Sequence, residues 1–524
     1  MLAQHCERCK IPNTLKLMGE RTRRSILNAE VNLIFYFLTL VLSFYSRKIF
    51  LDNLSAEFIG LYGTLSNILG YLNLAELGIA GCISFFLFKP LQSNNKAAIQ
   101  EILSVFGYLY RIIGTIIFIG GIIISLFFPL IFSNCEVESS VVYFAFYSIL
   151  GSSLIGYFIN YRQILLSADQ KNYLVAIYFQ SFGLLKTIIQ IYLAYTYKNL
   201  YIWVAIEFLF SVIGCVILNW KIKQVYPWLK TDKSKGRELL KKYPDILTNT
   251  RQIFIHKIKD LILNKSDELF IFFFVSLKMV AFYGNYMLIV TKIGQLFGSV
   301  LNSVDASIGN LVAENNKQNI MKVFWEMLTI RHFVAGLLCF SVFHFIEPFI
   351  AIWLGSEYVI DHSILLFLTI YSYISYSRQV VDMYNHAYGL YADTWSAWAE
   401  LIINISITII AGYYYGIVGL LLGKIISTGI IVIFWKPYYL FTSGLKENYR
   451  VYWEGALRNF AVSALSFCLA HYGIKKWLMF PLDGYISWGG YCALSLVVYL
   501  AINIILTILL CKGAKSSIAR IYKK

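Results

Sequence analysis

Long hydrophobic runs alternate with short polar connections along almost the whole chain. A helix that crosses a bilayer needs roughly 20 mostly apolar residues, and about fourteen runs reach that length. They cover 28–48, 58–88, 102–130, 140–166, 173–196, 200–220, 252–275, 279–303, 328–352, 362–388, 396–413, 416–438, 455–474 and 486–511. In lipid, the backbone polar groups of a spanning segment must be satisfied within a helix or a closed barrel. The pattern therefore predicts an all-α integral membrane protein with about 14 transmembrane helices.

The longest polar segment, Trp220 to Pro244, divides the chain into two comparable halves. It is rich in Lys and Arg and has only Asp232 and Glu238 as acids. Basic loops are retained on the cytoplasmic side during insertion, so this loop and, with an even number of spans, both termini are expected inside. The predicted organisation is a basic N-terminal arm (1–26), an N-lobe (27–220), a basic inter-lobe loop (221–250), a C-lobe (251–440), two further helices (441–511) and a basic tail (512–524).

The composition agrees with a membrane location. The 524 residues are 58% hydrophobic and only 14% charged, whereas soluble proteins carry roughly 25% charged residues. Basic inner loops account for the net charge of +16, so no nucleic-acid partner is expected. Cys6 and Cys9 have the spacing of half a zinc site, but no second pair follows, and no metal is expected.

Short sequences in the first half recur in the second half at a nearly constant offset. Tyr62-Gly63 corresponds to Tyr283-Gly284, and Trp220-Lys221 corresponds to Trp435-Lys436. The stretch from Arg162 to Asp169 is similarly echoed by Arg378-Gln379 and, further on, Asp393. An even number of intervening helices keeps both copies in one orientation. The pattern predicts parallel repeats related by a pseudo-two-fold along the membrane normal, with a substrate site between them.

Several stretches resemble the bacterial polysaccharide transporters, the Wzx-type lipid-linked oligosaccharide flippases of the multidrug/oligosaccharidyl-lipid/polysaccharide exporter (MOP) superfamily. The resemblance covers nearly the whole chain. It rests on Leu72 to Ile79 with Glu76 and Gly78, Leu87 to Leu91, Arg162 to Tyr173, His256-Lys257 with Asp267, and Ala387 to Tyr391. It implies two six-helix lobes around a central cavity, two extra helices, and alternating access in a bacterial inner membrane.

The function implied by the resemblance is translocation of a polyprenyl-pyrophosphate-linked oligosaccharide from the inner to the outer leaflet, for surface polysaccharide biosynthesis. Membrane lipids and polysaccharide assembly proteins are candidate partners, and a monomer is expected. One alternative is a multidrug or toxin-extruding ion antiporter of the same superfamily. A membrane glycosyltransferase or polymerase is less favoured, because the chain has no long loop with catalytic residues and no nucleophile–base set or phosphate-binding loop. An enzyme is therefore not expected.

Basic residues within the apolar runs are the candidate substrate-binding residues. A charge at mid-membrane costs about 2.5–3.5 kcal/mol on insertion scales, so such a residue normally faces the protein interior or a wet cavity. Cations around a cavity would replace part of the hydration of a pyrophosphate. The alternatives are buried ion pairs and side chains that snorkel to the interface. The candidates are Lys186, Lys292, Lys424, Arg162, Arg378 and Lys257.

Acidic residues at membrane depth are candidates for ion coupling or for charge pairing. A carboxylate there can bind Na⁺ or take up a proton and so link transport to a gradient; no other cofactor is expected. The candidates are Glu76, Asp267, Asp260, Glu400 and Glu30.

Small residues recur at close spacing in the second half of the chain, at Gly412, Gly416, Gly419 and Gly423. This spacing predicts close packing of two helices.

Overall fold

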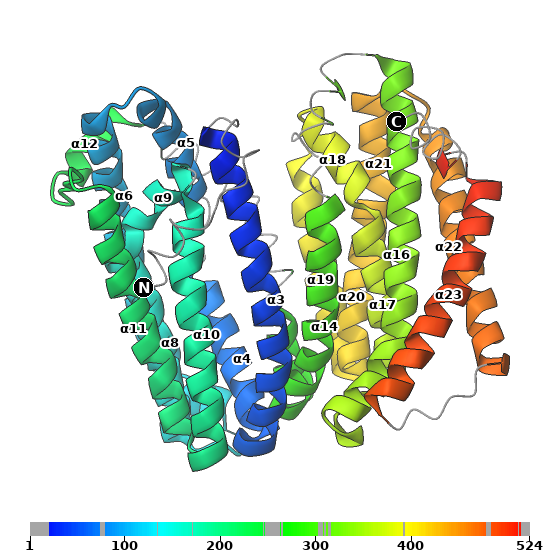
Figure 1. Ribbon diagram of the computed structural model, residues 1–524, viewed down its shortest axis with the longest axis horizontal. Helices are drawn as coiled ribbons and strands as arrows, with labels where there is room; N and C mark the ends of the chain where they lie inside the picture. The colour runs from blue at the N-terminus through cyan, green and yellow to red at the C-terminus, as the bar shows by residue number, and fades with distance from the viewer. Residues whose placement is uncertain are drawn as a thin grey trace, which may run out of the picture. The chain divides into compact units, whose positions relative to one another are not determined.

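The computed structural model describes residues 20–73, 79–133, 135–169, 171–244, 246, 263, 266–301, 308, 311–312, 316–390, 393–477, 484–511 and 513–514. Throughout these ranges the regular structure is helical, without β-strands, which confirms the predicted all-α class. The chain forms two compact units, Met1–Leu261 and Ile262–Lys524. In Figure 1 each unit is a bundle of long helices.

Unit 1 contains the helices of the first half of the chain. They are α3 (Glu20–Leu54), α4 (Ala56–Leu72), α5 (Ile79–Gln92), α6 (Lys96–Ser125), α7 (Phe128–Ile131), α8 (Ser139–Phe158), α9 (Gln163–Ala168), α10 (Asn172–Tyr197), α11 (Leu200–Val225) and α12 (Gly236–Lys242). Polar side chains cap several of the helix starts, since each accepts a bond from an otherwise unpaired N–H. The Asn95 side chain accepts from the Ala98 N–H at α6, and the Asn199 side chain accepts from the Ile202 N–H at α11.

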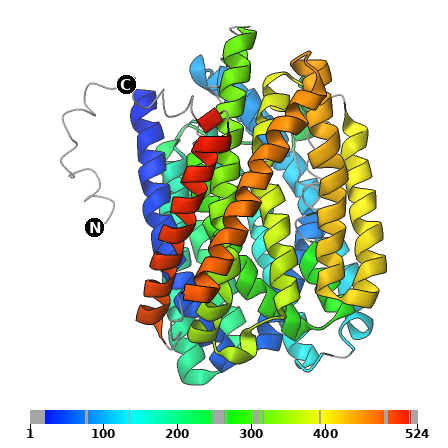
Figure 2. The same cartoon turned by 90° about the vertical axis from the view of Figure 1, so that its right-hand side faces the viewer.

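Unit 2 contains a helix over 266–274 and the helices that follow it. They are α14 (Leu277–Leu301), α16 (Lys317–Trp353), α17 (His362–Ser377), α18 (Gln379–Ala387), α19 (Thr394–Tyr415), α20 (Ile417–Thr428), a π-helical segment (Gly429–Trp435), α21 (Lys436–Tyr439), α22 (Tyr449–Trp477) and α23 (Tyr485–Leu510). Figure 2 shows α22 and α23 running beside α16, against which both pack. The last two helices therefore belong to the core of unit 2.

Among the described residues, nine helices are long and apolar enough to cross a membrane. The protein is thus a multi-pass membrane protein. The other predicted spans coincide with shorter or more polar helices or with residues outside the described ranges, so the count of about fourteen stays a prediction. These spans are 58–88, 252–275, 279–303, 362–388 and 455–474.

Residues 226–244 of the predicted basic inter-lobe loop, called here the basic cap, pack against the helices of unit 1. The Gln100 amide donates to the Trp228 carbonyl at 2.6 Å, and the Asp232 N–H donates to the Ser104 hydroxyl at 3.0 Å. A Cβ atom on Gly236 would lie 2.2 Å from the Tyr108 Cβ atom, so only glycine allows α12 to lie this close to α6. The cap is held by side chains of α6 that the sequence pattern did not single out.

Ion pairing also anchors the end of the basic cap. Lys242 Nζ lies 2.6 Å from Glu101 Oε2, and the Tyr243 hydroxyl donates to the same oxygen at 2.7 Å. Burial, followed by this bond to Glu101, raises the pKa of Tyr243 to about 12. The Tyr243 phenol therefore stays protonated at neutral pH and donates to the Glu101 carboxylate.

Asp169 of unit 1 and Asp393 of unit 2, matched in the sequence comparison of the two halves, each accept a hydrogen bond from an aromatic side chain. In unit 1 the Tyr226 hydroxyl donates to Asp169 Oδ2 at 2.7 Å. In unit 2 the Trp435 indole Nε1–H donates to Asp393 Oδ2 at 3.1 Å. In each unit an aromatic side chain at the end of a later helix donates to the carboxylate, although Tyr226 and Trp435 are not matched positions of the repeat inferred from sequence.

The predicted close packing of small residues is present between α19 and α20. A Cβ atom on Gly419 would lie 2.1 Å from the Ala411 carbonyl oxygen, and one on Gly423 would lie 2.3 Å from Thr408 Oγ1. Gly416, with φ +55°, ends α19 in the left-handed region that favours glycine. These glycines allow the two backbones to approach closely.

Gly423→Ala is expected to lower the free energy of unfolding by about 1–3 kcal/mol, because the added methyl overpacks this contact. Gly473→Ala is the matched control, since a Cβ atom on Gly473 of α22 has no neighbour within 4 Å. The control should be neutral or slightly stabilising, as alanine is the better helix former. Denaturant unfolding of the full chain in detergent measures both. Equal effects of the two variants would show that the α19–α20 contact is not tight.

Candidate functional site

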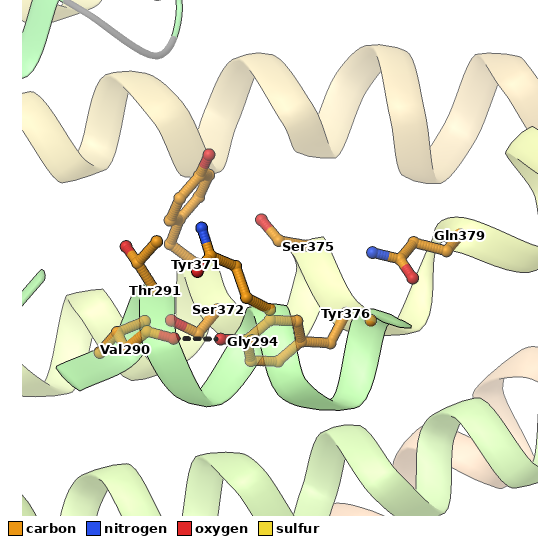
Figure 3. Close-up of a pocket in the computed structure, with 10 residues that line it drawn as sticks. Val290, Thr291, Gly294, Tyr371, Ser372, Ser375, Tyr376 and Gln379 are labelled. Carbon is orange, nitrogen blue, oxygen red and sulfur yellow. Dashed lines mark hydrogen bonds between the residues drawn. The ribbon is translucent and has the colours of Figure 1, made fainter. Parts of the chain in front are cut away.

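A polar pocket of about 490 Å³ lies in unit 2 between α14 and α17 (Figure 3). Its hydrogen-bonding groups are neutral hydroxyls and amides, with two aromatic rings among them. On α17, Tyr376 donates its hydroxyl to the Val290 carbonyl of α14 at 3.2 Å. Glycines on α14 provide the space, since a Cβ atom on Gly294 would lie 2.8 Å from the Tyr376 hydroxyl. The lining residues are Val290, Thr291, Gly294, Gln295, Gly298, Tyr371, Ser372, Ser375, Tyr376 and Gln379.

Arg331 of α16 fixes one end of the pocket. Its side chain is 4% exposed, and Nη1 donates to Gln379 Oε1. Because that oxygen is occupied by the guanidinium, the Gln379 amide nitrogen is directed toward Ser375 (Figure 3). A buried arginine thus orients a neutral donor at the pocket wall.

The other end of the pocket borders a buried ion pair. Lys424 Nζ lies 2.5 Å from Asp267 Oδ2, and both side chains are less than a tenth exposed. The same ammonium lies 5.1 Å from the ring centroid of Tyr371, a lining residue. Lys424, a candidate for substrate binding, and Asp267, a candidate for ion coupling or charge pairing, therefore lie together beside the pocket.

Lys186 is paired within unit 1. Its Nζ lies 2.5 Å from Glu207 Oε1, between α10 and α11, and both side chains are about a quarter exposed. The Gln190 amide donates to Glu207 Oε2 and to the Trp203 carbonyl, each at 3.1 Å. The Lys186 ammonium thus belongs to a polar cluster that includes a carboxylate.

Arg162 lies where α8 gives way to a 3₁₀ turn and then α9. Its Nη2 donates to the Thr231 hydroxyl at 2.8 Å, and Nε donates to the Tyr161 hydroxyl at 3.2 Å. Lys233 donates to the Phe158 carbonyl at 2.8 Å and lies 4.4 Å from the Tyr161 ring centroid. Burial, and then the charges of Arg111 and Arg162, lower the pKa of Lys233. In this structure Arg162 fastens the basic cap to α8 and α9.

Arg378 follows the last residue of α17. Its Nε lies 3.9 Å from Asp382 Oδ2, whereas Lys436 Nζ lies 2.8 Å from Asp382 Oδ1. Lys436 is therefore the closer cation to this carboxylate. Arg378 also lines a second, apolar groove of unit 2.

The remaining candidates are placed as follows. Lys292 of α14 is half-buried, and in sequence it lies between Thr291 and Gly294, which line the polar pocket. Glu400 of α19 is 3% exposed, whereas Glu30 of α3 is exposed. Lys257, Asp260, Glu76 and the Cys6–Cys9 pair lie outside the described residues.

Three charged residues in or beside the apolar runs were not singled out by the reasoning from sequence. Glu207 and Arg331 lie inside predicted spans, and Glu326 lies two residues before one. Each is a charge in or beside an apolar stretch, the signal that marks functional or paired residues in membranes. Glu326 is 3% exposed on α16.

Comparisons with known proteins identify the fold. The structure of a lipid II flippase, MurJ, in an inward closed conformation matches with a TM-score of 0.65 and 15% identity, covering 92% of this chain and 99% of that chain. An inward-facing multidrug resistance MATE family transporter of the MOP superfamily matches with a TM-score of 0.56 and 14% identity, covering 80% and 98%. No protein-family model and no curated protein sequence matches the chain. The chain thus has the two-lobe fold of MOP-superfamily transporters, as the sequence resemblance predicted.

Proposed function

We propose that this protein is a flippase that moves a polyprenyl-pyrophosphate-linked oligosaccharide from the inner to the outer leaflet of a bacterial inner membrane, for surface polysaccharide biosynthesis. The observation that carries the proposal is the polar pocket between α14 and α17. Neutral hydroxyls and amides beside aromatic rings suit a sugar, which presents many hydroxyls and apolar ring faces. The fold shared with a lipid II flippase supports the same conclusion.

The cations beside the pocket suit the pyrophosphate. Arg331 contacts Gln379 at one end, and Lys424 lies over Tyr371 at the other. Tyr371 of α17 and Gln379, the first residue of α18, are eight residues apart, about 12 Å at 1.5 Å per residue. Lys292 lies on the facing helix α14. A sugar in the pocket would therefore place an attached anion within reach of a basic side chain.

Transport would proceed by alternating access, with the polyprenyl tail remaining in lipid. Asp267 and Glu400 are the carboxylates of unit 2 proposed to couple transport to Na⁺ or H⁺, or to serve as charge partners. Asp267 already compensates Lys424, so a substrate phosphate that approaches Lys424 would compete with that carboxylate. Both termini are proposed to be cytoplasmic and the transporter to act as a monomer beside polysaccharide assembly proteins.

A multidrug ion antiporter is the second candidate, favoured by the likeness to a MATE transporter. An organic cation would require a pocket in which acidic side chains outweigh basic ones. The described residues that line the polar pocket include no carboxylate. Beside the pocket lie two basic residues, Arg331 and Lys424, and one acidic residue, Asp267, which is paired with Lys424. Pocket chemistry therefore favours the anionic, sugar-bearing lipid.

A flipping assay in proteoliposomes tests the proposed function. Wild type is expected to move a fluorescent polyprenyl-pyrophosphate oligosaccharide between leaflets and to leave an organic cation dye untransported. Lys292→Gln should slow flipping roughly tenfold, as expected for loss of one charge-assisted contact to phosphate. Lys446→Gln, an exposed basic residue remote from the pocket in sequence, serves as the control. Dye transport driven by an ion gradient, without lipid flipping, would contradict the proposal.

A further inference from the structure

A second cavity of unit 2 is a long apolar groove of about 620 Å³ between α16, α17, the π-helical segment and α22. Its rim is formed by large apolar side chains that remain exposed on the surface of the unit, including Ile370, Phe434, Leu457 and Phe460, at 40–61%. In a membrane-spanning bundle, an exposed apolar rim meets lipid chains. The groove is therefore accessible to the hydrocarbon of a bilayer lipid.

Several polar side chains that line the groove are hydrogen-bonded within unit 2. His332 Nδ1 and the Tyr373 hydroxyl are 2.7 Å apart, and the Ser463 hydroxyl donates to the His332 carbonyl at 3.3 Å. An apolar chain lying over them would bury no unpaired hydrogen-bonding group. The walls thus accept hydrocarbon along the length of the groove.

One end of the groove is cationic. Arg378 lines this end, together with Tyr452 and Trp453 at the start of α22. A guanidinium has five N–H donors and binds phosphate oxygens bidentately, and Tyr and Trp are the side chains enriched at the level of lipid headgroups. The nearby carboxylate of Asp382 has Lys436 as its closer partner. The end of the groove therefore favours an anionic phosphate.

The length of the groove matches one leaflet. From Leu366 of α17 to Arg378, which caps the end of that helix, the chain rises about 18 Å at 1.5 Å per residue. Half of a hydrocarbon core of about 30 Å is roughly 15 Å. A single acyl chain can therefore follow the groove from Arg378 toward the bilayer centre.

We propose that this groove is a binding site for an anionic phospholipid, with its phosphate on Arg378 and one acyl chain between α17 and α22. Basic pockets between spanning helices recognise such headgroups. The lipid-linked oligosaccharide is a poorer fit, because the groove lacks the hydroxyl and amide array of the polar pocket. The bound phospholipid would contact both α17 of the predicted C-lobe and α22, one of the two helices that follow that lobe. This inference is independent of the identity of the transported substrate.

Native mass spectrometry of the full-length protein, released from nanodiscs of equal phosphatidylglycerol and phosphatidylcholine, tests the site. Wild type should retain phosphatidylglycerol in preference to phosphatidylcholine. Arg378→Gln should reduce that retention roughly tenfold, because one charge-assisted contact is lost. Arg450→Gln is the matched control, an exposed arginine near the same end of α22 that does not line the groove. Equal retention by wild type and Arg378→Gln would overturn the proposal.

A second measurement uses the wild-type chain and so does not depend on the folding of a variant. Phosphatidylglycerol with a photoactivatable group on an acyl chain should label peptides of α17 and α22, including the segment around Cys468, an exposed lining residue. Unlabelled phosphatidylglycerol should reduce the labelling, and phosphatidylcholine should not. Labelling confined to other helices would contradict the site. Displacement by a polyprenyl pyrophosphate at lower concentration than by phosphatidylglycerol would also contradict it and would assign the groove to the transported lipid.

Discussion

Replacing Asp267 by leucine is expected to lower the free energy of unfolding by about 3–5 kcal/mol, the usual effect of breaking a buried ion pair by removing one partner. Lys424 is 6% exposed and lies 2.5 Å from the Asp267 carboxylate. Without Asp267, a positive charge would remain buried and lose its closest anion. Denaturant unfolding of the full-length protein in detergent, followed by tryptophan fluorescence, measures this loss.

Two further variants separate the buried charge from other effects of the substitution. The double variant Asp267→Leu with Lys424→Met removes both charges and should recover most of the lost stability, since apolar replacements of buried pairs are often neutral. Lys186→Met removes one partner of the pair with Glu207, which is about a quarter exposed, and should destabilise less. A double variant as unstable as Asp267→Leu would show that the pair is not what stabilises this region.

Filling the polar pocket with Ser375→Trp is expected to slow lipid flipping at least tenfold. The indole would occupy a large part of the cavity of about 490 Å³ between α14 and α17, where the sugar is proposed to bind. Steric exclusion from a pocket removes most of the contacts that a bound head group makes there. The initial flipping rate in proteoliposomes, normalised to the amount of reconstituted protein, measures the effect.

Phe367→Trp is the matched control because it places the same side chain on α17 without lining the pocket or the groove. It should flip at close to the wild-type rate. Ser375→Ala should lose only a few-fold, since one neutral hydrogen bond contributes about 1 kcal/mol. Wild-type flipping by a folded Ser375→Trp protein would exclude this pocket from the transport pathway.

The fold class could be predicted from sequence because the relevant signal is local. Long apolar runs define spanning helices, and Gly419 and Gly423 mark a close helix contact that the structure confirms. The resemblance around Arg162 and Asp169 predicted the superfamily fold that the lipid II flippase comparison bears out. Each of these features is set by residues near one another in the chain.

The partners of the buried charges could not be predicted, because pairing depends on how helices rotate and tilt against one another. Lys424 and Asp267 are far apart in sequence yet form one ion pair, and Lys186 pairs with Glu207 on the next helix. Arg331 was missed because its role depends on Gln379 of a different helix. The folding of the basic cap onto α6 was missed for a related reason, since Gly236 shows its importance only once Tyr108 lies against it.

Photo-crosslinking with a lipid-linked oligosaccharide that carries a photoactivatable sugar tests the central claim most directly. The full-length wild-type protein in nanodiscs would be irradiated with this lipid and analysed by peptide mass spectrometry. We expect adducts on α14, on α17 and at the start of α18, near Tyr371, Ser375 and Gln379, suppressed by excess unlabelled substrate. Specific adducts confined to other helices, with α14 and α17 unmodified, would contradict it.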